Sequence, residues 1–298
     1  MREDIRKIQE MMEAAEYVTD APVATSVHLA MRLRKPLLIE GPAGVGKTEV
    51  AKVMSRMLGT NLIRLQCYEG LDASTALYEW NYQKQLLHIK LEESGHNNRA
   101  MADKEHEIFS ETFLLRRPLL QAITQEAQSP VLLVDEVDRT DEEFEAFMLE
   151  VFSDWQVTIP EIGTIKATHP PHVILTSNRT RELSDALRRR CLYLWIDYPT
   201  YEKEVAIVER KVPGVNVRLA REVSRFMESL RKVRLAKVPG VAETLDWAQA
   251  LAGLHADHLD ETLVNETLGC VLKDADDMKR FRAEVGKSGL APFLQVSG

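Results

Sequence analysis

The sequence has little of what marks secreted, membrane-spanning or zinc-stabilised proteins. Its 298 residues include three cysteines, Cys67, Cys191 and Cys270, and no two of them form a C-x-x-C pair. This pattern argues against a disulfide framework and a structural zinc site, and it fits a reducing compartment. There is no run of about 18 apolar residues, and no apolar signal core follows the charged N-terminal stretch. We therefore expect a cytoplasmic protein without a membrane span.

Positive charge is also scarce. Lysine and arginine together number 38 against 46 aspartates and glutamates, which gives a formal net charge of −8. Bulk charge does not draw such a chain to nucleic acid or to an anionic membrane, so a nucleic-acid partner is not expected. Short basic runs at residues 32–35 and 188–190 need a separate explanation. With 45% apolar residues, the length allows one large domain or two domains.

One stretch carries a motif with a defined chemistry. Residues 41–48 read GPAGVGKT and match G-x-x-x-x-G-K-[ST], the pattern of a phosphate-binding P-loop. The apolar run PLLIE before it predicts a buried strand, and the apolar spacing after it predicts a helix that Gly59 ends. Backbone N–H groups at the start of such a helix, together with the helix dipole, favour bound phosphate.

The motif predicts a site for ATP. We expect Lys47 to reach the β- and γ-phosphates and the Thr48 hydroxyl to hold Mg²⁺. The residues predicted to contact the nucleotide are Gly41, Pro42, Ala43, Gly44, Val45, Gly46, Lys47, Thr48, Glu49 and, further along the chain, Asp135. Tyr17 and Val18 precede the motif, and they either cover the adenine base or belong to the core.

A pair of carboxylates follows a second apolar run. Residues 131–138 read VLLVDEVD, which predicts a buried strand ending in Asp135 and Glu136. Behind a P-loop this is the Walker B pattern, in which Asp135 holds the Mg²⁺ shell. Glu136 then orients and activates water for attack on the γ-phosphate. Because transfer to a bound hydroxyl does not need the second carboxylate, the pair favours hydrolysis over small-molecule kinase activity.

A third apolar run ends in an amide. Residues 172–178 read HVILTSN, which predicts a buried strand with Asn178 at its end. Taken alone, Asn178 is a turn residue. In series with the P-loop and the carboxylate pair, we interpret it as a nucleotide sensor that contacts the γ-phosphate and the attacking water. Lys47, Glu136 and Asn178 are thus the catalytic residues that the strand and loop patterns predict.

The pattern of elements changes along the chain. Apolar strands alternate with helices at first, and the later residues read as helices only. This predicts an α/β nucleotide-binding core at 1–198 and a helical lid domain at 199–298. Residues 81–112 interrupt the core with a polar stretch that reads as an exposed insertion or mobile loop. Its histidines lack metal-ligand spacing and are expected to be solvated, namely His88, His96 and His106.

These motifs in this order resemble the AAA+ ATPases, and more closely the MoxR family. Within it the chain is similar to the CoxD-like branch, the maturation ATPases of carbon monoxide dehydrogenase. The resemblance covers nearly the whole chain and rests on GPAGVGKTE, CYEGLDASTALYEWNYQKQLL, FLLRRPLLQAI, VLLVDEVDR, MLEVFSDWQVTIPE, LTSNRTRELSDALRRRCLYLWIDYP and PGVAETLDWAQAL. It implies a P-loop NTPase fold of class α/β, with a three-layer core around a parallel sheet and a small all-helical lid.

The resemblance also implies how the chain works. ATP would bind between neighbours in a homo-oligomeric ring, usually a hexamer, and hydrolysis would drive a chaperone that remodels or matures a client metalloenzyme. That client would be of the molybdenum hydroxylase or carbon monoxide dehydrogenase type, and a von Willebrand factor A domain protein would be a further partner. An arginine finger would enter the neighbouring site. By the match of RRRC to the S-R-C of related proteins it is Arg190, with Arg189 as second choice.

One position departs from the family pattern. Where many lid domains carry a sensor-2 arginine, this sequence has Glu243, and a carboxylate cannot replace a cation beside triphosphate. Either sensor 2 is absent, or another base such as Arg234 or Lys237 supplies it. Two alternatives stay open beside the ATPase. One is a DNA-directed motor or loader, against which the acidic charge counts, and the other is a low-turnover binding module that ATP gates.

Overall fold

The computed structural model describes residues 2–94 and 107–294. The chain forms two compact units, each built from separate segments. The sheet unit comprises Thr25–Glu40 and Met54–Leu194, and the helical unit comprises Met1–Ala24, Gly41–Val53 and Trp195–Gly298. The domain boundary expected at residue 198 stays a prediction.

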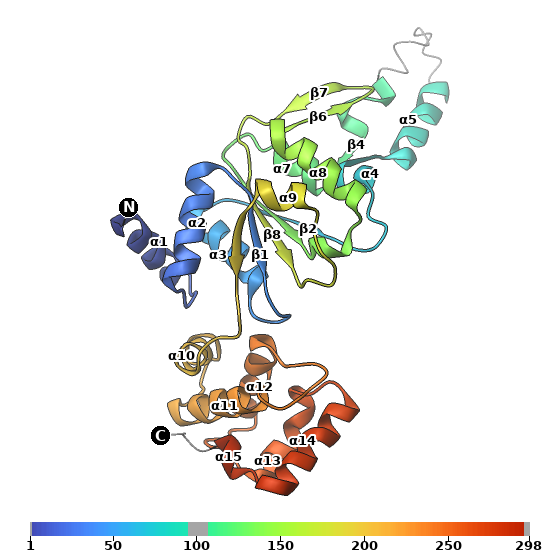
Figure 1. Ribbon diagram of the computed structural model, residues 1–298. Coiled ribbons are helices and arrows are strands. Elements are labelled where there is room, and N and C mark those ends of the chain that lie inside the picture. Colours follow the sequence, from blue (N-terminus) through green and yellow to red (C-terminus); the bar gives the residue numbers. More distant parts are fainter. Residues whose placement is uncertain (1, 95–106, 295–298) are drawn as a thin grey trace. The chain divides into compact units, whose positions relative to one another are not determined.

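A five-stranded sheet forms the centre of the sheet unit (Figure 1). Its strands are β1 (Leu37–Glu40), β2 (Leu62–Gln66), β5 (Val131–Asp135), β8 (His172–Ser177) and β9 (Leu192–Trp195), in the spatial order β2-β5-β8-β1-β9. The pairings of β2 with β5, β5 with β8 and β8 with β1 are parallel. Strands β1 and β5 are buried along their whole length, as short apolar strands in parallel sheets are. The predicted α/β fold is confirmed.

Helices connect these strands. They are α2 (Ala21–Leu33), α3 (Lys47–Leu58), α7 (Pro118–Ile123), α8 (Glu142–Asp154) and α9 (Asp185–Arg190). In the sheet unit α7 and α8 pack on the sheet, and Leu120, Met148 and Leu132 belong to one buried apolar cluster (Figure 1). Since β5 and β8 are parallel neighbours, their C-terminal ends lie side by side at one edge of the sheet.

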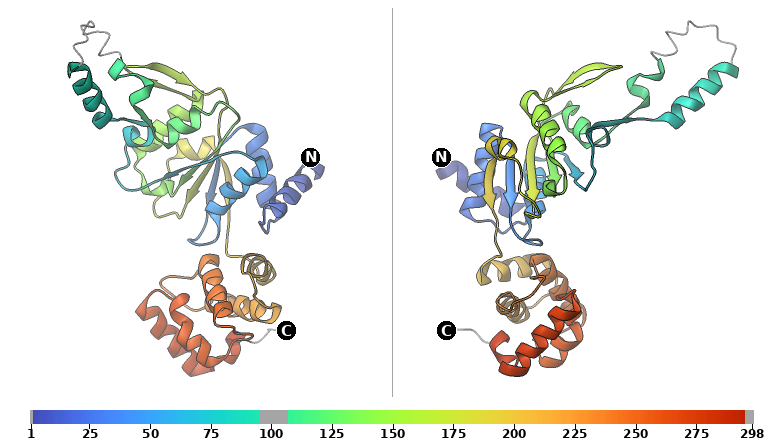
Figure 2. Two further views of the ribbon diagram at one scale, coloured as in Figure 1. Left: turned by 180° about the vertical axis from the view of Figure 1, so that it is seen from behind. Right: turned by 45° about the vertical axis from the view of Figure 1, so that its right-hand side comes forward.

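The region expected as an exposed insertion at 81–112 has more structure than its sequence predicts. Helix α5 (Tyr82–Ser94) begins directly after the short strand β3 (Tyr78–Trp80), and both views of Figure 2 show it standing away from the five-stranded sheet. The expectation of a loop is therefore wrong for residues 82–94. Apolar side chains lie on several sides of α5, so no single apolar stripe indicates a helix. His96 and His106 fall outside the described residues.

Two hairpins complete the sheet unit. Strand β3 pairs antiparallel with β4 (Leu114–Arg116), which follows the 3₁₀ turn η1 (Glu111–Phe113), and α4 (Ala73–Leu77) precedes β3. Strands β6 (Gln156–Ile159) and β7 (Gly163–Lys166) form the second hairpin. A further 3₁₀ turn, η2 (Val137–Arg139), follows β5 and leads into α8.

After β9 the described residues form helices only, which confirms the helical C-terminal part. They are α10 (Tyr201–Lys211), α11 (Val217–Leu230), α12 (Val241–Gly253), α13 (Glu261–Thr267), η3 (Leu268–Cys270), α14 (Ala275–Ser288) and α15 (Ala291–Leu294). The helical unit also contains α1 (Arg2–Ala14). Its core centres on the ring of Phe226, which lies 4.8 Å from the Trp247 ring and 5.6 Å from the Phe281 ring. Among the described residues, every helix is too short or too polar to cross a lipid bilayer.

A buried ion pair joins three helices of the helical unit. Glu204 on α10 is fully buried and accepts hydrogen bonds from Arg231 Nη1 at 2.6 Å and Nη2 at 2.7 Å. Thr244 on α12 donates its hydroxyl to the same carboxylate at 2.6 Å. Charge-assisted, bidentate pairs of this kind fix the relative orientation of the elements that carry them.

We predict that Glu204→Ala lowers the free energy of unfolding by about 3–5 kcal/mol, because Arg231 is left buried without its carboxylate. Chemical denaturation followed by circular dichroism measures the change. Glu209→Ala is the matched control, since Glu209 lies on the same helix and is exposed. Similar losses of stability in the two variants would contradict this role of Glu204.

Candidate functional site

The P-loop leaves β1 at Gly41, and α3 begins at Lys47. Gly41 has φ +153°, and a Cβ atom there would lie 1.9 Å from the carbonyl oxygen of Ile196, so only glycine fits. Gly44 and Gly46 also have positive φ values, +74° and +96°, which side chains rarely adopt. The predicted strand, glycine loop and helix are therefore present, with the backbone geometry that a phosphate cradle needs.

Lys47 is held inside this loop. It is 7% exposed, and its Nζ donates to the carbonyl oxygens of Gly41 at 2.8 Å and Pro42 at 2.6 Å. Thr48, the next residue of α3, is half-buried. The buried ammonium group and the start of α3 place positive charge at one point, as binding of a polyphosphate requires.

Glu49 and Tyr17, which the sequence placed near the nucleotide, make contacts inside the helical unit. Glu49 pairs with Lys52 at 3.5 Å and with Lys211 at the end of α10 at 3.7 Å. Burial and the carboxylates of Asp20 and Glu49 raise the pKa of the Tyr17 hydroxyl, so Tyr17 is a neutral, mostly enclosed ring close to α3. A nucleotide contact of Glu49 stays a prediction.

The first turn of α12 rests on the P-loop. The backbone N–H groups of Val241 and Ala242 donate to the Gly44 carbonyl oxygen at 2.8 and 3.3 Å. The Glu243 carboxylate accepts from the Gly240 N–H at 2.8 Å and so caps the start of α12. This gives a physical role to the residue that departs from the family pattern, because it stabilises the helix end that contacts the loop.

The two bases considered as substitutes for sensor 2 lie on the surface of the helical unit. Arg234 and Lys237 lie in the segment between α11 and α12, and both residues are exposed. Their side chains make no hydrogen bond or ion pair to other residues in the described part of the chain.

Asp135 ends β5 in the sheet unit and is 4% exposed. The Thr176 hydroxyl on β8 donates to Oδ1 at 2.5 Å, and the Arg64 guanidinium on β2 contacts Oδ2 at 2.5 Å. A buried carboxylate that is held in this way presents hard oxygen atoms, which are the ligands that Mg²⁺ prefers. The residues present thus fit a magnesium ion.

Glu136 directly follows and has a left-handed backbone, with φ 58° and ψ 49°. Its N–H donates to the Thr176 hydroxyl at 2.9 Å. Its carboxylate accepts from Gln66 Nε2 at 3.3 Å and pairs with Arg139 at 3.1 Å. Left-handed backbone is costly for residues other than glycine, and Glu136 shares it with other described residues, among them Arg34 and Arg179.

Asp138 positions the turn that carries Asn178. Its buried carboxylate accepts from the N–H groups of Asn178 at 3.2 Å and Thr180 at 2.8 Å, and from the Thr180 hydroxyl at 2.7 Å. The structure therefore brings Asp135, Glu136 and Asn178 to the same edge of the sheet, as the strand order requires.

The buried thiol of Cys67 lies near the carboxylates at this edge of the sheet. Burial raises the pKa of Cys67 to about 12, and the charges of Asp135, Asp138 and Glu136 add to the rise.

The arginine run forms the end of α9, and its members differ in their contacts. Arg188 lies 3.4 Å from the buried Glu40 carboxylate. Arg190 donates to the Leu149 carbonyl oxygen at 2.8 Å and to Ser153 Oγ at 3.0 Å, both on α8 of its own chain. Arg189 is exposed and has no polar partner in the described part of the chain.

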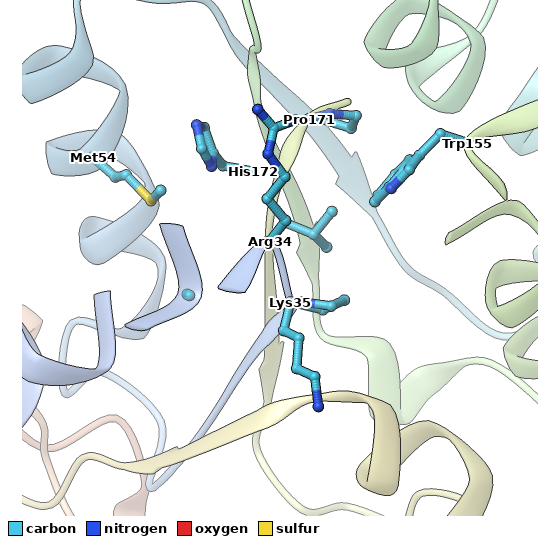
Figure 3. A pocket seen from close by; sticks show the side chains of 9 residues that line it. Arg34, Lys35, Met54, Trp155, Pro171 and His172 are labelled. Carbon is cyan, nitrogen blue, oxygen red and sulfur yellow. The ribbon is translucent and has the colours of Figure 1, made fainter. Parts of the chain in front are cut away.

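A cavity at the opposite edge of the sheet, where β8 begins, does not suit a nucleotide (Figure 3). Its volume of about 10 Å³ holds no more than a water molecule. Arg34 extends beside His172, and Lys35 points away from it. Burial and the charge of Arg34 lower the pKa of His172, so the imidazole is neutral near pH 7.

The sequence interpretation missed three residues of the site. Arg64, Thr176 and Asp138 contact the predicted catalytic residues or the turn that carries them, and each acts between strands that are distant in the chain. Of the three, only Asp138 had a local signal, because it is the second aspartate of VLLVDEVD.

Comparisons with known proteins agree with this geometry. The family described as AAA domain (dynein-related subfamily) matches residues 36–191, more than half of the chain. An uncharacterized protein of Staphylococcus epidermidis is 23% identical over 228 residues, which cover 74% of this chain and 78% of that protein. The gas vesicle ATPase GvpN of Haloferax mediterranei is 25% identical over 295 residues, which cover 95% of this chain and 81% of GvpN.

A solved structure gives the same fold. A single-residue mutant of RuvB from Thermotoga maritima matches with a TM-score of 0.51 at 15% identity, covering 96% of this chain and 76% of that chain. At this identity the likeness concerns the fold alone.

We predict that Gly240→Ala weakens the binding of a fluorescent ATP analogue. The added Cβ would lie 2.7 Å from the Gly44 Cα and carbonyl carbon, so α12 and the loop must move apart. Overpacking costs about 1–3 kcal/mol, which corresponds to a loss of affinity of roughly 5-fold to 150-fold if the whole cost falls on the nucleotide-bound state. Gly253→Ala, at the other end of α12 with no atom within 4 Å of its Cβ, is the control. Unchanged affinity in Gly240→Ala would contradict a role of this contact.

Proposed function

Because the chain belongs to the AAA domain family (dynein-related subfamily), we propose that it is a Mg²⁺-dependent ATPase that converts ATP and water to ADP and phosphate. The observation that carries the proposal is the carboxylate pair Asp135 and Glu136 at the end of β5, in a chain whose β1 runs directly into a P-loop. Proteins of this class bind nucleotide at the P-loop and hold the magnesium ion with a Walker B aspartate.

Each residue has a distinct role in this proposal. The P-loop amides and Lys47 bind the β- and γ-phosphates, and Thr48 and Asp135 hold the magnesium ion, which neutralises phosphate charge. Glu136 accepts a hydrogen bond from water and orients it toward the γ-phosphate. Asn178 binds the same water or a γ-phosphate oxygen. The support is the fixed backbone of Glu136 and Asn178 at one sheet edge.

We further propose that identical chains form a ring, a hexamer by the family resemblance, in which an arginine of one chain completes the site of the next. A guanidinium is planar and always charged, and it suits two phosphate oxygens. Arg189 supports this proposal because it is exposed on α9 without a polar partner in the described part of the chain. Arg190 has to leave its contacts on α8 to act in the same way.

The biological role that we propose is that of a cytoplasmic MoxR-type chaperone. It would remodel or mature a client metalloenzyme, together with a von Willebrand factor A domain protein. The likeness to GvpN supports the MoxR-type assignment, and the CoxD-like client rests on the sequence resemblance. Leu86, Leu87 and Leu91 on α5 are 58%, 59% and 61% exposed, which supports α5 as a surface for such a partner.

We predict that Glu136→Gln lowers kcat for phosphate release by at least about 100-fold, because the amide cannot accept the proton of the attacking water. Binding of Mg·ATP, measured with a fluorescent analogue, should stay within about twofold of wild type, since the P-loop is unchanged. Glu143→Gln, an exposed glutamate on α8, is the control. If turnover barely changes in Glu136→Gln, that residue is misassigned and the low-turnover binding module becomes the better description.

We predict that Arg189→Ala lowers ATPase activity by about 10³-fold or more, because it removes charge stabilisation supplied from a neighbour. Mixing it with Glu136→Gln should restore activity, since some mixed interfaces then combine an intact Glu136 with an intact arginine. Arg190→Ala is tested in the same way, and the arginine whose loss is rescued is the finger.

The control for the mixing experiment is a chain that carries both substitutions, which should rescue neither variant. Rescue of neither arginine variant, together with constant specific activity down to concentrations at which the protein is monomeric, would overturn the ring proposal.

A further inference from the structure

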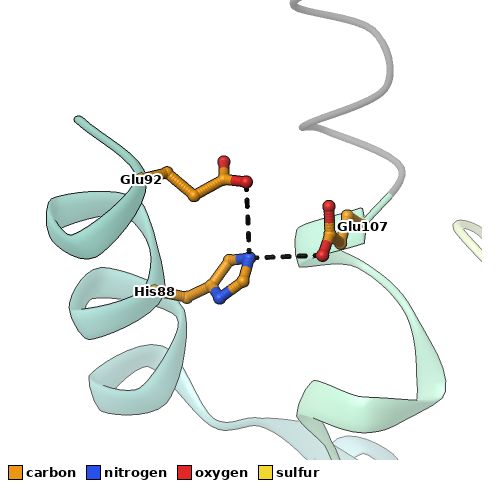
Figure 4. Close-up of side chains that lie close together, drawn as sticks. All are labelled: His88, Glu92 and Glu107. Atoms are coloured by element: carbon orange, nitrogen blue, oxygen red, sulfur yellow. Dashed lines mark ion pairs between the residues drawn. The ribbon is translucent and has the colours of Figure 1, made fainter. Parts of the chain in front are cut away.

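Three side chains able to bind a metal ion converge beside α5 (Figure 4). His88 and Glu92 lie one helical turn apart on α5, and Glu107 approaches from the segment that leads back to η1. His88 Nε2 lies 3.4 Å from Glu107 Oε1 and 3.9 Å from Glu92 Oε1. All three donor atoms lie within 4.8 Å of one another. None of these residues belongs to the proposed ATPase site.

The separations suit a shared ion. In a tetrahedral zinc site, with bonds of about 2.0–2.2 Å, neighbouring donor atoms lie about 3.3–3.5 Å apart. The His88–Glu107 separation already has this value, and the His88–Glu92 separation exceeds it by a few tenths of an ångström. A small rotation of the Glu92 carboxylate, whose side chain is 14% exposed, therefore completes three ligands, and a fourth position remains for water.

The imidazole is aimed at this point by its surroundings. The His88 ring lies 5.3 Å from the Phe113 ring, and its Nε2 is enclosed without a hydrogen bond in the described part of the chain. The expectation that His88 is solvated therefore holds only in part, since the side chain is 32% exposed while Nε2 is enclosed. A buried imidazole nitrogen facing two carboxylates gains more from a dication than from either carboxylate alone.

The two segments that carry the ligands are held together independently of the cluster. Gln85 Nε2 donates to the Ile108 carbonyl oxygen at 2.8 Å, next to Glu107 in the chain. The Asn81 N–H donates to the Phe113 carbonyl oxygen at 2.8 Å. The site is thus pre-organised, so metal binding does not have to order α5 against the returning segment.

We propose that His88, Glu92 and Glu107 bind one divalent transition-metal ion, with Zn²⁺ as the best-fitting ion. One imidazole and two carboxylates are a mixed nitrogen and oxygen set, which suits zinc and its neighbours better than Mg²⁺ or Ca²⁺. The bound ion ties α5 to residue 107 and fixes the helix that presents the exposed leucines. This goes beyond the proposed ATPase and is independent of it, because the ligands lie outside the P-loop and Walker B segments.

The test is a zinc titration of the full chain without nucleotide, after removal of metal with a chelator. Competition with a chromophoric chelator gives affinity and stoichiometry. We expect one tight Zn²⁺ per chain, and at least about tenfold weaker binding in His88→Ala and in Glu107→Gln. Cobalt substitution should give visible d–d bands without a thiolate charge-transfer band, which separates this site from the cysteines.

Two controls keep the outcome specific. His258→Ala removes an exposed histidine that pairs with only one carboxylate, Asp257, and should leave zinc binding unchanged. Asp135→Asn should also leave it unchanged, which separates the site from the proposed magnesium site. Circular dichroism of each variant confirms folding. Zinc affinity that is unaffected by His88→Ala and Glu107→Gln, or lost in Asp135→Asn, would overturn the proposal.

Discussion

The hydroxyl group of Thr176 is the contact on which the candidate site depends. It is buried at the end of β8, donates to the Asp135 carboxylate and accepts from the Glu136 N–H. The hydroxyl thereby acts as donor and acceptor at once, and it fixes the Asp135 carboxylate relative to the Glu136 backbone. Because an unmatched polar group here would be buried without water, the arrangement has little freedom to relax.

In the helical unit, backbone hydrogen bonds hold the P-loop against the start of α12. Glycines at 44 and 240 let two backbones approach more closely than side chains permit, and the start of α12 then donates two N–H groups to the loop. Glu243 accepts from the Gly240 N–H at the same helix end.

Local patterns in the sequence predicted the P-loop, the strand ending in Asp135 and Glu136, and the strand before Asn178, because each is a short apolar run next to a distinctive polar residue. The parallel sheet and the helical C-terminal part followed from the change in periodicity. Helix α5 was missed since its leucines face several directions. Arg64, Thr176 and Asp138 were missed because strand pairing, which brings together residues about 40 to 70 positions apart, leaves no mark in a local pattern. His88 was misread in part for the same reason, since Glu107 lies beyond any local spacing rule.

The guanidinium of Arg64 on Asp135 has a consequence for the order in which ligands arrive. The Arg64 guanidinium already neutralises the Asp135 carboxylate, which the proposed mechanism assigns to the metal ion. A free divalent cation therefore has to displace the arginine. When the metal comes bound to a triphosphate, the phosphates offer the arginine a new anionic partner at the same moment. In the proposed mechanism this ion pair favours a magnesium ion that enters together with the nucleotide as one complex.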